Sequence, residues 1–350
     1  MSELAWIILE AGIKGAAIVG LVMTLAAASV YAERKVSAAI QDRIGPNRVG
    51  PWGTFQPFAD VIKLFMKEDL VPIAADRAFH RLAPVISLGV AFAVFAVVPF
   101  AHYVEIGGNI IYLGVAPDIN IGILYVLAMT SVGVYGITLA GWSSNNKYSL
   151  LGGLRSAAQM ISYELSMGLA VVGVVMVTGS LSLNDIIIEQ GGWSGWKWNI
   201  FVQPLGFIIF LISSFAETNR APFDLPEAEP ELVGGFNTEY TGMKFGMFFL
   251  AEYGNMATAS AIITILFLGG WQLPIPPEIL GLEAGSIALA VVQFIVFFAK
   301  VAFMIFFFIW VRWSIPRFRY DQLMDLGWKV MLPLALLNVA IVGLGVLIFK

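Results

Sequence analysis

The chain of 350 residues contains no cysteine, which excludes disulfide bonds, cysteine-ligated iron–sulfur clusters and thiol catalysis. Only two histidines occur, His80 and His102, and neither lies deep in an apolar run. A haem held between helices by two histidines is therefore not expected. We expect no metal, haem, flavin or iron–sulfur cluster on this chain. It can host a diffusible redox molecule or ions, but it should not relay electrons alone.

Charge is scarce as well: 13% of the residues are charged and 59% are hydrophobic, and the mean hydropathy is +0.82. Apolar segments of about twenty residues, the length that crosses a bilayer, recur along the whole chain. The sequence therefore predicts an all-α polytopic membrane protein, with residues 1–350 forming a single transmembrane domain. Eight spans are expected, at approximately 12–31, 82–101, 119–141, 157–178, 199–216, 245–270, 285–311 and 330–349.

The first apolar run is followed by small residues, as in a signal peptide. However, Glu3 and Glu10 precede it, where a signal peptide carries positive charge. We therefore expect a retained first helix and no cleaved targeting segment.

Basic residues gather on the odd-numbered loops, those that follow spans one, three, five and seven. Of twenty lysines and arginines, sixteen lie there: Arg34, Lys35, Arg43, Arg48, Lys63, Lys67, Arg77, Arg81, Lys147, Arg155, Arg220, Lys244, Arg312, Arg317, Arg319 and Lys329. The even-numbered loops hold only Lys197. Because positive loops stay inside, the odd loops, including 32–81 and 217–244, are predicted to be cytoplasmic and both termini to lie outside.

An amphipathic pattern occupies residues 53–68 of the first loop. Phe55, Phe58 and further apolar residues recur at helical spacing, while Asp60 and Lys63 fall on the opposite side. This pattern predicts a helix that lies in the membrane interface. Two interpretations stay open: the helix only packs against the bundle, or its phenylalanine face lines an entrance for a lipid-like ligand.

The stretch ETNRAPFDLPEAEPELVGGFNTEY, residues 217–240, is the most polar part of the chain. It holds one base, Arg220, and six carboxylates: Glu217, Asp224, Glu227, Glu229, Glu231 and Glu239. Prolines recur there every fourth residue, and we expect them to exclude a helix.

In an extended segment, Glu227, Glu229 and Glu231 would share one face. Like charges so close to an apolar slab should raise some of the carboxyl pKa values and couple their titrations. This is what a proton-handling site requires. The alternative is an acidic loop in solvent.

Three charged residues fall deep inside predicted spans, namely Glu164 in span four, Glu252 in span six and Lys300 in span seven, while Lys14 lies near the outer start of span one. Tyr253 follows Glu252. A charge at the membrane centre costs roughly 2.5–3.5 kcal/mol, so such residues face the bundle interior and mark a pathway. With the acidic loop, the two acids predict a chain of carboxylates running inward, although a neutral, hydrogen-bonded structural acid is the alternative. Lys300 is either a counter-charge to an acid or a structural anchor.

Four segments of the chain resemble the family of NADH:quinone oxidoreductase (respiratory complex I) membrane subunits to which mitochondrial NADH dehydrogenase subunit 1 belongs. They are AERKVSAAIQDRIGPNRVGPWGTFQPFADVIKLFMKED, SYELSMG, ETNRAPFDLPEAEPELVGGFNTEY and PRFRYDQLMDLGWK. The resemblance extends from the first span to the last. The first and third segments are long and specific.

The resemblance implies an oxidoreductase subunit that joins the hydrophilic arm to the pump arm in the bacterial cytoplasmic (inner) membrane. It would form much of a chamber for ubiquinone or menaquinone, which enters from the bilayer past the first span and the interfacial helix. The implied partners are soluble iron–sulfur subunits at the cytoplasmic face, other membrane subunits and membrane lipids, with no nucleic acid.

The expected site residues fall into three groups, and none of them is catalytic on this chain alone. Quinone binding is expected at Arg34, Arg43, Asp60, Phe55 and Phe58. Proton coupling is expected at Glu164, Glu217, Arg220, Asp224, Glu227, Glu229, Glu231, Glu239, Glu252 and Tyr253. Subunit docking is expected at Arg317 and Arg319.

Two other functions are compatible with the sequence. A stand-alone cation transporter would also carry internal acids, but large rigid loops suit docking better than alternating access. The equivalent subunit of a membrane-bound hydrogenase or ferredoxin-linked complex would share the acidic loop, but such relatives generally match the first-loop segment less well. Purification with soluble iron–sulfur and flavin proteins would exclude the transporter, and gene neighbours would separate the two complexes.

Overall fold

A computed structural model describes residues 3–106, 109–191, 195, 197–227, 229–283 and 285–349. Within these ranges, seven helical segments are long and apolar enough to cross a membrane. They comprise α1 (Glu3–Ile40), α3 (Arg77–Val94), α4 (Gly122–Ser143), α5 (Lys147–Thr178), α10 (Gly242–Phe267), α11 (Ile287–Ser314) and α13 (Leu332–Phe349). A π-helical turn, Leu326–Met331, joins α13 to the preceding helix α12 (Tyr320–Asp325). The fifth predicted span corresponds to a shorter apolar helix, α8 (Pro204–Glu217). The predicted all-α polytopic membrane fold is confirmed.

Several helices extend past the predicted spans. Helix α1 continues to Ile40, because residues 32–40 contain neither proline nor glycine and favour a helix. Helix α5 begins at Lys147, where the Asn146 side chain accepts a hydrogen bond from the Tyr148 amide at 3.0 Å. It ends before Gly179, whose φ of 77° suits the left-handed conformation that closes helices.

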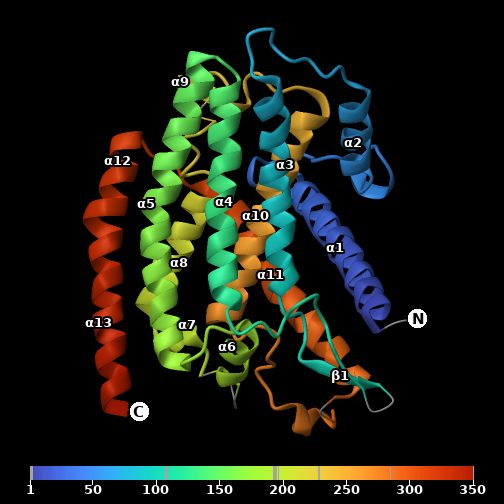
Figure 1. The fold of residues 1–350 in the computed structure, drawn as a ribbon, viewed down its shortest axis with the longest axis vertical. Coiled ribbons are helices and arrows are strands. Elements are labelled where there is room, and N and C mark those ends of the chain that lie inside the picture. The colour runs from blue at the N-terminus through green and yellow to red at the C-terminus, as the bar shows by residue number, and fades with distance from the viewer. Residues whose placement is uncertain are drawn as a thin grey trace.

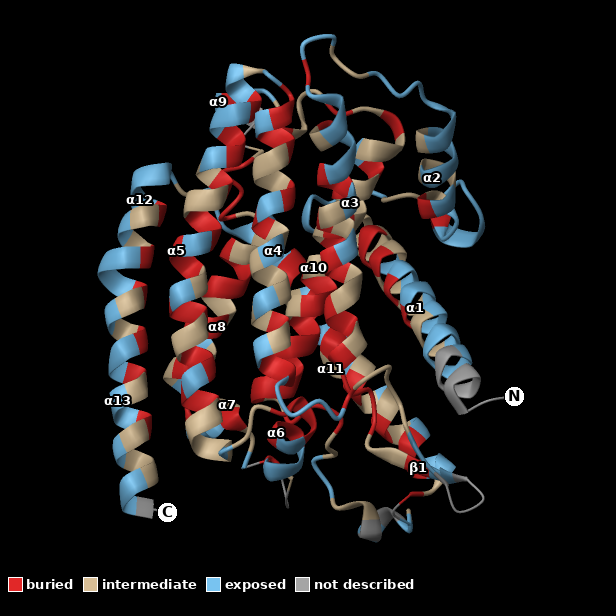
Figure 2. Ribbon diagram, in the orientation of Figure 1, coloured by how far each residue is buried: buried red, intermediate tan, exposed pale blue. Residues whose placement is uncertain are grey.

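Helix α10 is the most buried of the long helices (Figure 2). It packs against α1, α3, α8 and α11, while α4 and α5 complete the bundle around it. Helix α13 contacts α5 and α8 at one side of the molecule, and α1 diverges from the bundle toward its N-terminus (Figure 1). The centre of the bundle is therefore the place where charged groups are best shielded from lipid.

The amphipathic segment forms α2 (Gln56–Met66), which lies beside α1 (Figure 1). A tight turn and a short 3-10 helix, Pro51–Gly53, lead into it. A Cβ at Gly53 would lie 2.3 Å from the Pro46 carbonyl oxygen, and φ there is 80°, so the turn requires glycine. This turn fixes where α2 sits relative to the end of α1.

The loops after α1, α4, α8 and α11 gather at one end of the molecule (Figure 1). This end also carries α2 and the one-turn helix α9 (Glu229–Leu232). The opposite end holds α6 (Leu183–Glu189), α7 (Asn199–Val202) and an antiparallel hairpin of β1 (Tyr103–Ile106) and β2 (Asn109–Tyr112), in which Tyr103 pairs with Tyr112. The polar odd-numbered loops thus share one end, which we name the loop end.

Candidate functional site

A group of charged side chains occupies the bundle interior just below the loop end. Arg220, fully buried in the turn after α8, places Nη1 at 2.7 Å from Glu33 Oε2 and Nε at 2.9 Å from Glu252 Oε1. Arg312 Nη1 lies 2.7 Å from Glu33 Oε1 and 3.8 Å from Glu252 Oε1. Two carboxylates and two guanidinium groups, from α1, α10, α11 and the acidic stretch, therefore form one charge cluster.

Tyr253 completes the charge cluster. Its hydroxyl donates to Glu33 Oε2 at 2.9 Å, and the Arg220 guanidinium carbon lies 4.2 Å from the centre of its ring. Burial disfavours a charged Arg220, but the carboxylates of Glu252 and Glu33 outweigh this and raise its pKa above the ordinary value. The arginine therefore stays charged, and any change of proton content falls on the carboxyl groups around it.

Two acids of the 217–240 stretch lie next to the charge cluster. Burial raises the pKa of Asp224 to about 6, although Arg317 Nη2, 2.7 Å from its Oδ2, opposes the rise. Burial, together with the charges of Glu252 and Asp224, raises the pKa of Glu227 to about 8. The Asn237 side chain donates to Glu227 Oε1 at 2.5 Å. Both carboxyl pKa values are raised, as expected from the sequence, and that of Glu227 lies above neutral pH while that of Asp224 stays below it.

Glu231 and Glu239 have partners different from those of Glu227. Glu231, with half of its side chain exposed, turns outward to Arg155 at 2.6 Å, and Glu239 accepts a hydrogen bond from Asn146 at 2.6 Å. The prediction of an extended segment is wrong here, because residues 229–232 form one helical turn despite Pro230. The backbone of Glu229 begins that turn, and its side chain lies outside the described residues.

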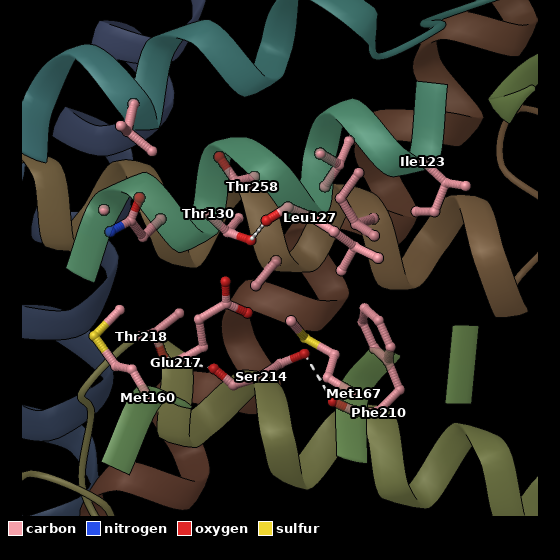
Figure 3. A pocket seen from close by; sticks show the side chains of 16 residues that line it. Ile123, Leu127, Thr130, Met160, Met167, Phe210, Ser214, Glu217, Thr218 and Thr258 are labelled. Carbon is pink, nitrogen blue, oxygen red and sulfur yellow. Dashed lines mark hydrogen bonds between the residues drawn. The ribbon is translucent and has the colours of Figure 1, made fainter. Parts of the chain in front are cut away.

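Deeper in the bundle, the two remaining acids belong to α5 and α8. Glu164 Oε1 accepts a hydrogen bond from the Ser131 hydroxyl of α4. Glu217, the last residue of α8, points into a cavity of about 40 Å³ toward Thr130 of α4 (Figure 3). A second cavity of similar volume is lined by Glu227 and Glu252. Carboxyl groups therefore line two cavities of the bundle, Glu227 and Glu252 in one and Glu217 in the other, and the predicted relay through them stays a prediction.

Helix α2 presents its apolar face outward. Phe55 and Phe58 are 53% and 63% exposed, and Ile62, Phe65 and Met66 share this exposure. This exposure does not support the interpretation in which the apolar face only packs on the bundle. The ion pair between Arg34 Nη1 and Asp60 Oδ2, at 2.7 Å, ties α1 to α2. Arg43 lies apart from that pair, exposed, and its Nε donates to Gln41 at 2.7 Å.

The remaining predicted residues have simpler surroundings. Arg317 pairs with Asp224, whereas Arg319 is exposed and pairs with Asp321 at 2.8 Å. Lys300 donates to the carbonyl oxygens of Leu268, Gly270 and Gln272 at 2.8, 2.9 and 2.8 Å. These contacts favour the anchor interpretation of Lys300, which holds the end of α10 to α11.

Sequence reasoning misses Glu33 and Arg312 as members of the charge cluster. Glu33 stands in the AERK segment and Arg312 follows the seventh predicted span, so the pattern assigns both to loops. The sequence does contain a signal, since Glu33 and Arg312 stand at the ends of their spans that face the odd-numbered loops. Nothing in the sequence shows that α1 and α11 are neighbours. Among the described residues, no group of His, Asp and Glu side chains is arranged to hold a metal ion.

Comparison with known proteins gives consistent results. A family model described as NADH dehydrogenase matches residues 13–343. NADH-quinone oxidoreductase subunit 8 of Rhodothermus marinus is 54% identical over 338 residues, covering 95% of this chain and 96% of that protein. An NADH-quinone oxidoreductase subunit of Cytophaga hutchinsonii is 50% identical over 342 residues, 98% of each chain. An NADH-quinone oxidoreductase subunit of Salinibacter ruber is 52% identical over 336 residues, 95% of this chain and 94% of that protein.

Proposed function

The chain belongs to the NADH dehydrogenase family and is a membrane subunit of an NADH-quinone oxidoreductase complex, and from this premise we propose that it couples quinone reduction to proton translocation. In this proposal it forms much of the quinone chamber, with ubiquinone or menaquinone as the bound substrate. The observation that carries the coupling is the series of carboxylates from Asp224 and Glu227, through the charge cluster, to Glu217.

Quinone reduction supplies the driving event. Two electrons arrive from an iron–sulfur cluster on a partner subunit, and the reduced quinone takes up two protons to become quinol. Negative charge arriving near the loop end favours protonated carboxyl groups and disfavours ionised ones. Glu227 and Asp224, with pKa values near neutrality, respond to this change most readily.

The charge cluster transmits the change inward. Arg220 contacts Glu33 and Glu252 together, and Arg312 contacts the same two acids, so a proton gained by one acid frees a guanidinium for the other. Glu252 also lines the cavity that holds Glu227. A proton at Glu227 and the ion pairs of the charge cluster are therefore coupled through space.

The quinone entrance is proposed at α1 and α2. The exposed phenylalanine face of α2 offers an apolar surface at the depth of the lipid headgroups, next to the C-terminal part of α1, to which the Arg34–Asp60 pair ties it. The soluble iron–sulfur subunits would dock at the loop end, where Arg319 is free to contact a partner subunit if its exposed pair with Asp321 opens. The membrane is proposed to be the bacterial cytoplasmic membrane, with the loop end in the cytoplasm.

The test compares buried and exposed acids of the same stretch. Glu227→Gln keeps size and hydrogen bonding but removes the proton, so we expect quinone reductase activity and proton pumping to fall together by about 100-fold or more, the lower range of acid–base contributions. Glu231→Gln, which loses only an exposed ion pair, should keep both within about twofold.

The measurements are NADH-driven proton uptake into inverted vesicles and the amount of complex on a native gel. Electron transfer from NADH to a water-soluble acceptor should survive in both variants, since it bypasses this chain. Wild-type pumping by an assembled Glu227→Gln complex would refute the carboxylate series as the coupling element.

A further inference from the structure

Two neighbouring cavities inside the bundle share part of their lining. The first, which contains Glu217, runs between α3, α4, α5, α8 and α10 (Figure 3). The second contains Glu227 and Glu252 and lies nearer the loop end. Each has a volume of about 40 Å³, and a buried water needs roughly 10–15 Å³ on that measure, so each has room for a few waters.

Each cavity is lined by a buried hydroxyl group that has no hydrogen-bond partner among the described residues. These hydroxyl groups belong to Thr258 in the first cavity and Ser87 in the second. Thr258 is 4% exposed and Ser87 is 5% exposed. A buried hydroxyl without a protein partner is normally satisfied by water. Water in both cavities would extend the carboxylate series at each end.

The two cavities share four lining residues, one from each of four segments: Gly133 of α4, Met160 of α5, Thr218 after α8 and Asn255 of α10. Three of them have side chains that are absent, fixed by a hydrogen bond, or short. Gly133 has no side chain, Thr218 donates to the carbonyl of Ser214 at 3.0 Å, and Asn255 is a short polar side chain suited to bonding water.

Met160 is the fourth shared residue and differs from the rest. Its unbranched thioether is flexible, and its sulfur accepts long hydrogen bonds from Ser156 and Asn219, both at 3.6 Å. Asn219 also contacts Gln159 and immediately precedes Arg220 of the charge cluster. A shift of the 217–220 turn would therefore pull on the Met160 sulfur.

We propose that Gly133, Met160, Thr218 and Asn255 form a gate between the two cavities, with the Met160 side chain as its moving part. With Met160 in place, the waters of the Glu252 cavity and those of the Glu217 cavity are separate. When Met160 swings aside, they join, and a proton passes from the Glu227 and Glu252 side to Glu217. This gate rests on the proposed function, since it regulates transfer along the same carboxylates.

Two variants test the gate, Gly133→Val by narrowing the passage and Met160→Ala by leaving it open. Gly133→Val adds bulk at the shared lining, where a Cβ would meet only Val90 Cγ1 at 3.7 Å. It should lower quinone-coupled turnover and pumping together by about tenfold, because transfer needs groups in hydrogen-bond reach or joined by one water. The matched control is Gly89→Val on α3, where a Cβ meets nothing within 4 Å.

Met160→Ala should leave the gate open instead of blocking it. A gate that no longer closes lets protons return, so protons pumped per NADH should fall about twofold or more while quinone reductase activity is kept. Met160→Leu restores an apolar side chain of similar volume and should return the ratio to the wild-type value. A residue with a merely structural role would not change this ratio while sparing turnover.

The outcomes separate the gate from the proposed function. If Gly133→Val and Met160→Ala assemble and pump with the wild-type rate and ratio while Glu227→Gln is inactive, the gate is refuted and the carboxylate series stands. If Glu227→Gln also pumps normally, both ideas are wrong. Should Gly133→Val fail to assemble, the solvent isotope effect on turnover is measured for Gly133→Ala instead. An isotope effect equal to that of the wild type would overturn the gate.

Discussion

Arg220 is the residue on which the other charges depend. It is fully buried, it contacts acids from α1 and α10, and it lies over the Tyr253 ring. A buried guanidinium is stable only while its carboxylates stay ionised, and the carboxylates in turn need the guanidinium. The planar fork also suits two acids at once in a way that a lysine ammonium does not.

Replacing Arg220 tests how far the other charges depend on it. Arg220→Ala leaves Glu33 and Glu252 with Arg312 alone, and breaking a buried ion pair costs about 3–5 kcal/mol. We expect loss of assembled complex on a native gel and a lower thermal midpoint for what remains. Lys329→Ala, which breaks the exposed pair with Asp325, is the control and should cost about 1 kcal/mol or less. Equal midpoints for both variants would contradict the central role of Arg220.

The second residue-scale prediction concerns pH. The pKa of Glu227 is raised from 4.5 to about 8 in the folded protein, so the folded state holds a proton that the unfolded state has already released. The stability from this proton is complete below pH 4.5 and is lost as pH rises through about 8. The thermal midpoint of Glu227→Gln relative to wild type should therefore increase from pH 5 to pH 8.5.

The matching spectroscopic measurement is the protonated carboxyl C=O stretch by infrared difference spectroscopy. Part of this band should disappear on titration above pH 7 in the wild type and be missing from Glu227→Gln. A band that is unchanged by the substitution would show that Glu227 is ionised throughout.

At the scale of the elements, α2 is the clearest case of a helix with a surface left uncovered. Phe55, Phe58 and the apolar residues that share their face are exposed, while Leu64 lies next to Gly246 of α10 and the Arg34–Asp60 pair holds the polar side to α1. A helix of this kind lies in the plane of the membrane interface. This exposed face next to α1 is the reason for placing the proposed quinone entrance there.

The element-scale prediction tests that entrance. Phe58→Glu places a charge on the apolar face and should lower quinone reductase activity, because the surface no longer suits an apolar ligand. NADH oxidation with a water-soluble acceptor should be unchanged. Phe58→Leu, at the same site, and Lys67→Glu, on the polar side, are the controls and should both remain active. Equal loss of the two activities in Phe58→Glu would mean failed assembly instead of a blocked entrance.

The elements were predictable because hydrophobic spacing is a local property. The eight apolar stretches and the amphipathic 53–68 segment needed only their own residues to be recognised. Glu33 could not be placed, because its role depends on Arg220 and Arg312, which are 187 and 279 residues away. The different orientations of Glu227 and Glu231 were missed for another reason: one helical turn, Glu229–Leu232, breaks the alternation of an extended chain.

At the scale of the whole molecule, the two ends of the bundle differ in the segments and charges that they carry. The loop end carries α2, α9, the acidic stretch and most of the basic residues, while the other end carries the hairpin and the short helices α6 and α7 (Figure 1). The gathering of the basic loops at one end is what the positive-inside rule requires of a consistent topology. Under the proposed orientation, with the loop end in the cytoplasm, this end would be the docking side for soluble subunits.

The last prediction tests this orientation with single cysteines, which the natural chain lacks. Val233→Cys, at a site 64% exposed on the loop end, should react with a membrane-impermeant maleimide only in inverted vesicles stripped of soluble subunits. Ile279→Cys, at a site 60% exposed near the other end, should react only from the outside of intact cells. Asn237 is a poor site, since its side chain donates to Glu227. If Val233→Cys reacts in intact cells, the bundle is inverted, and the acidic stretch then faces away from the NADH-oxidising subunits it is proposed to serve.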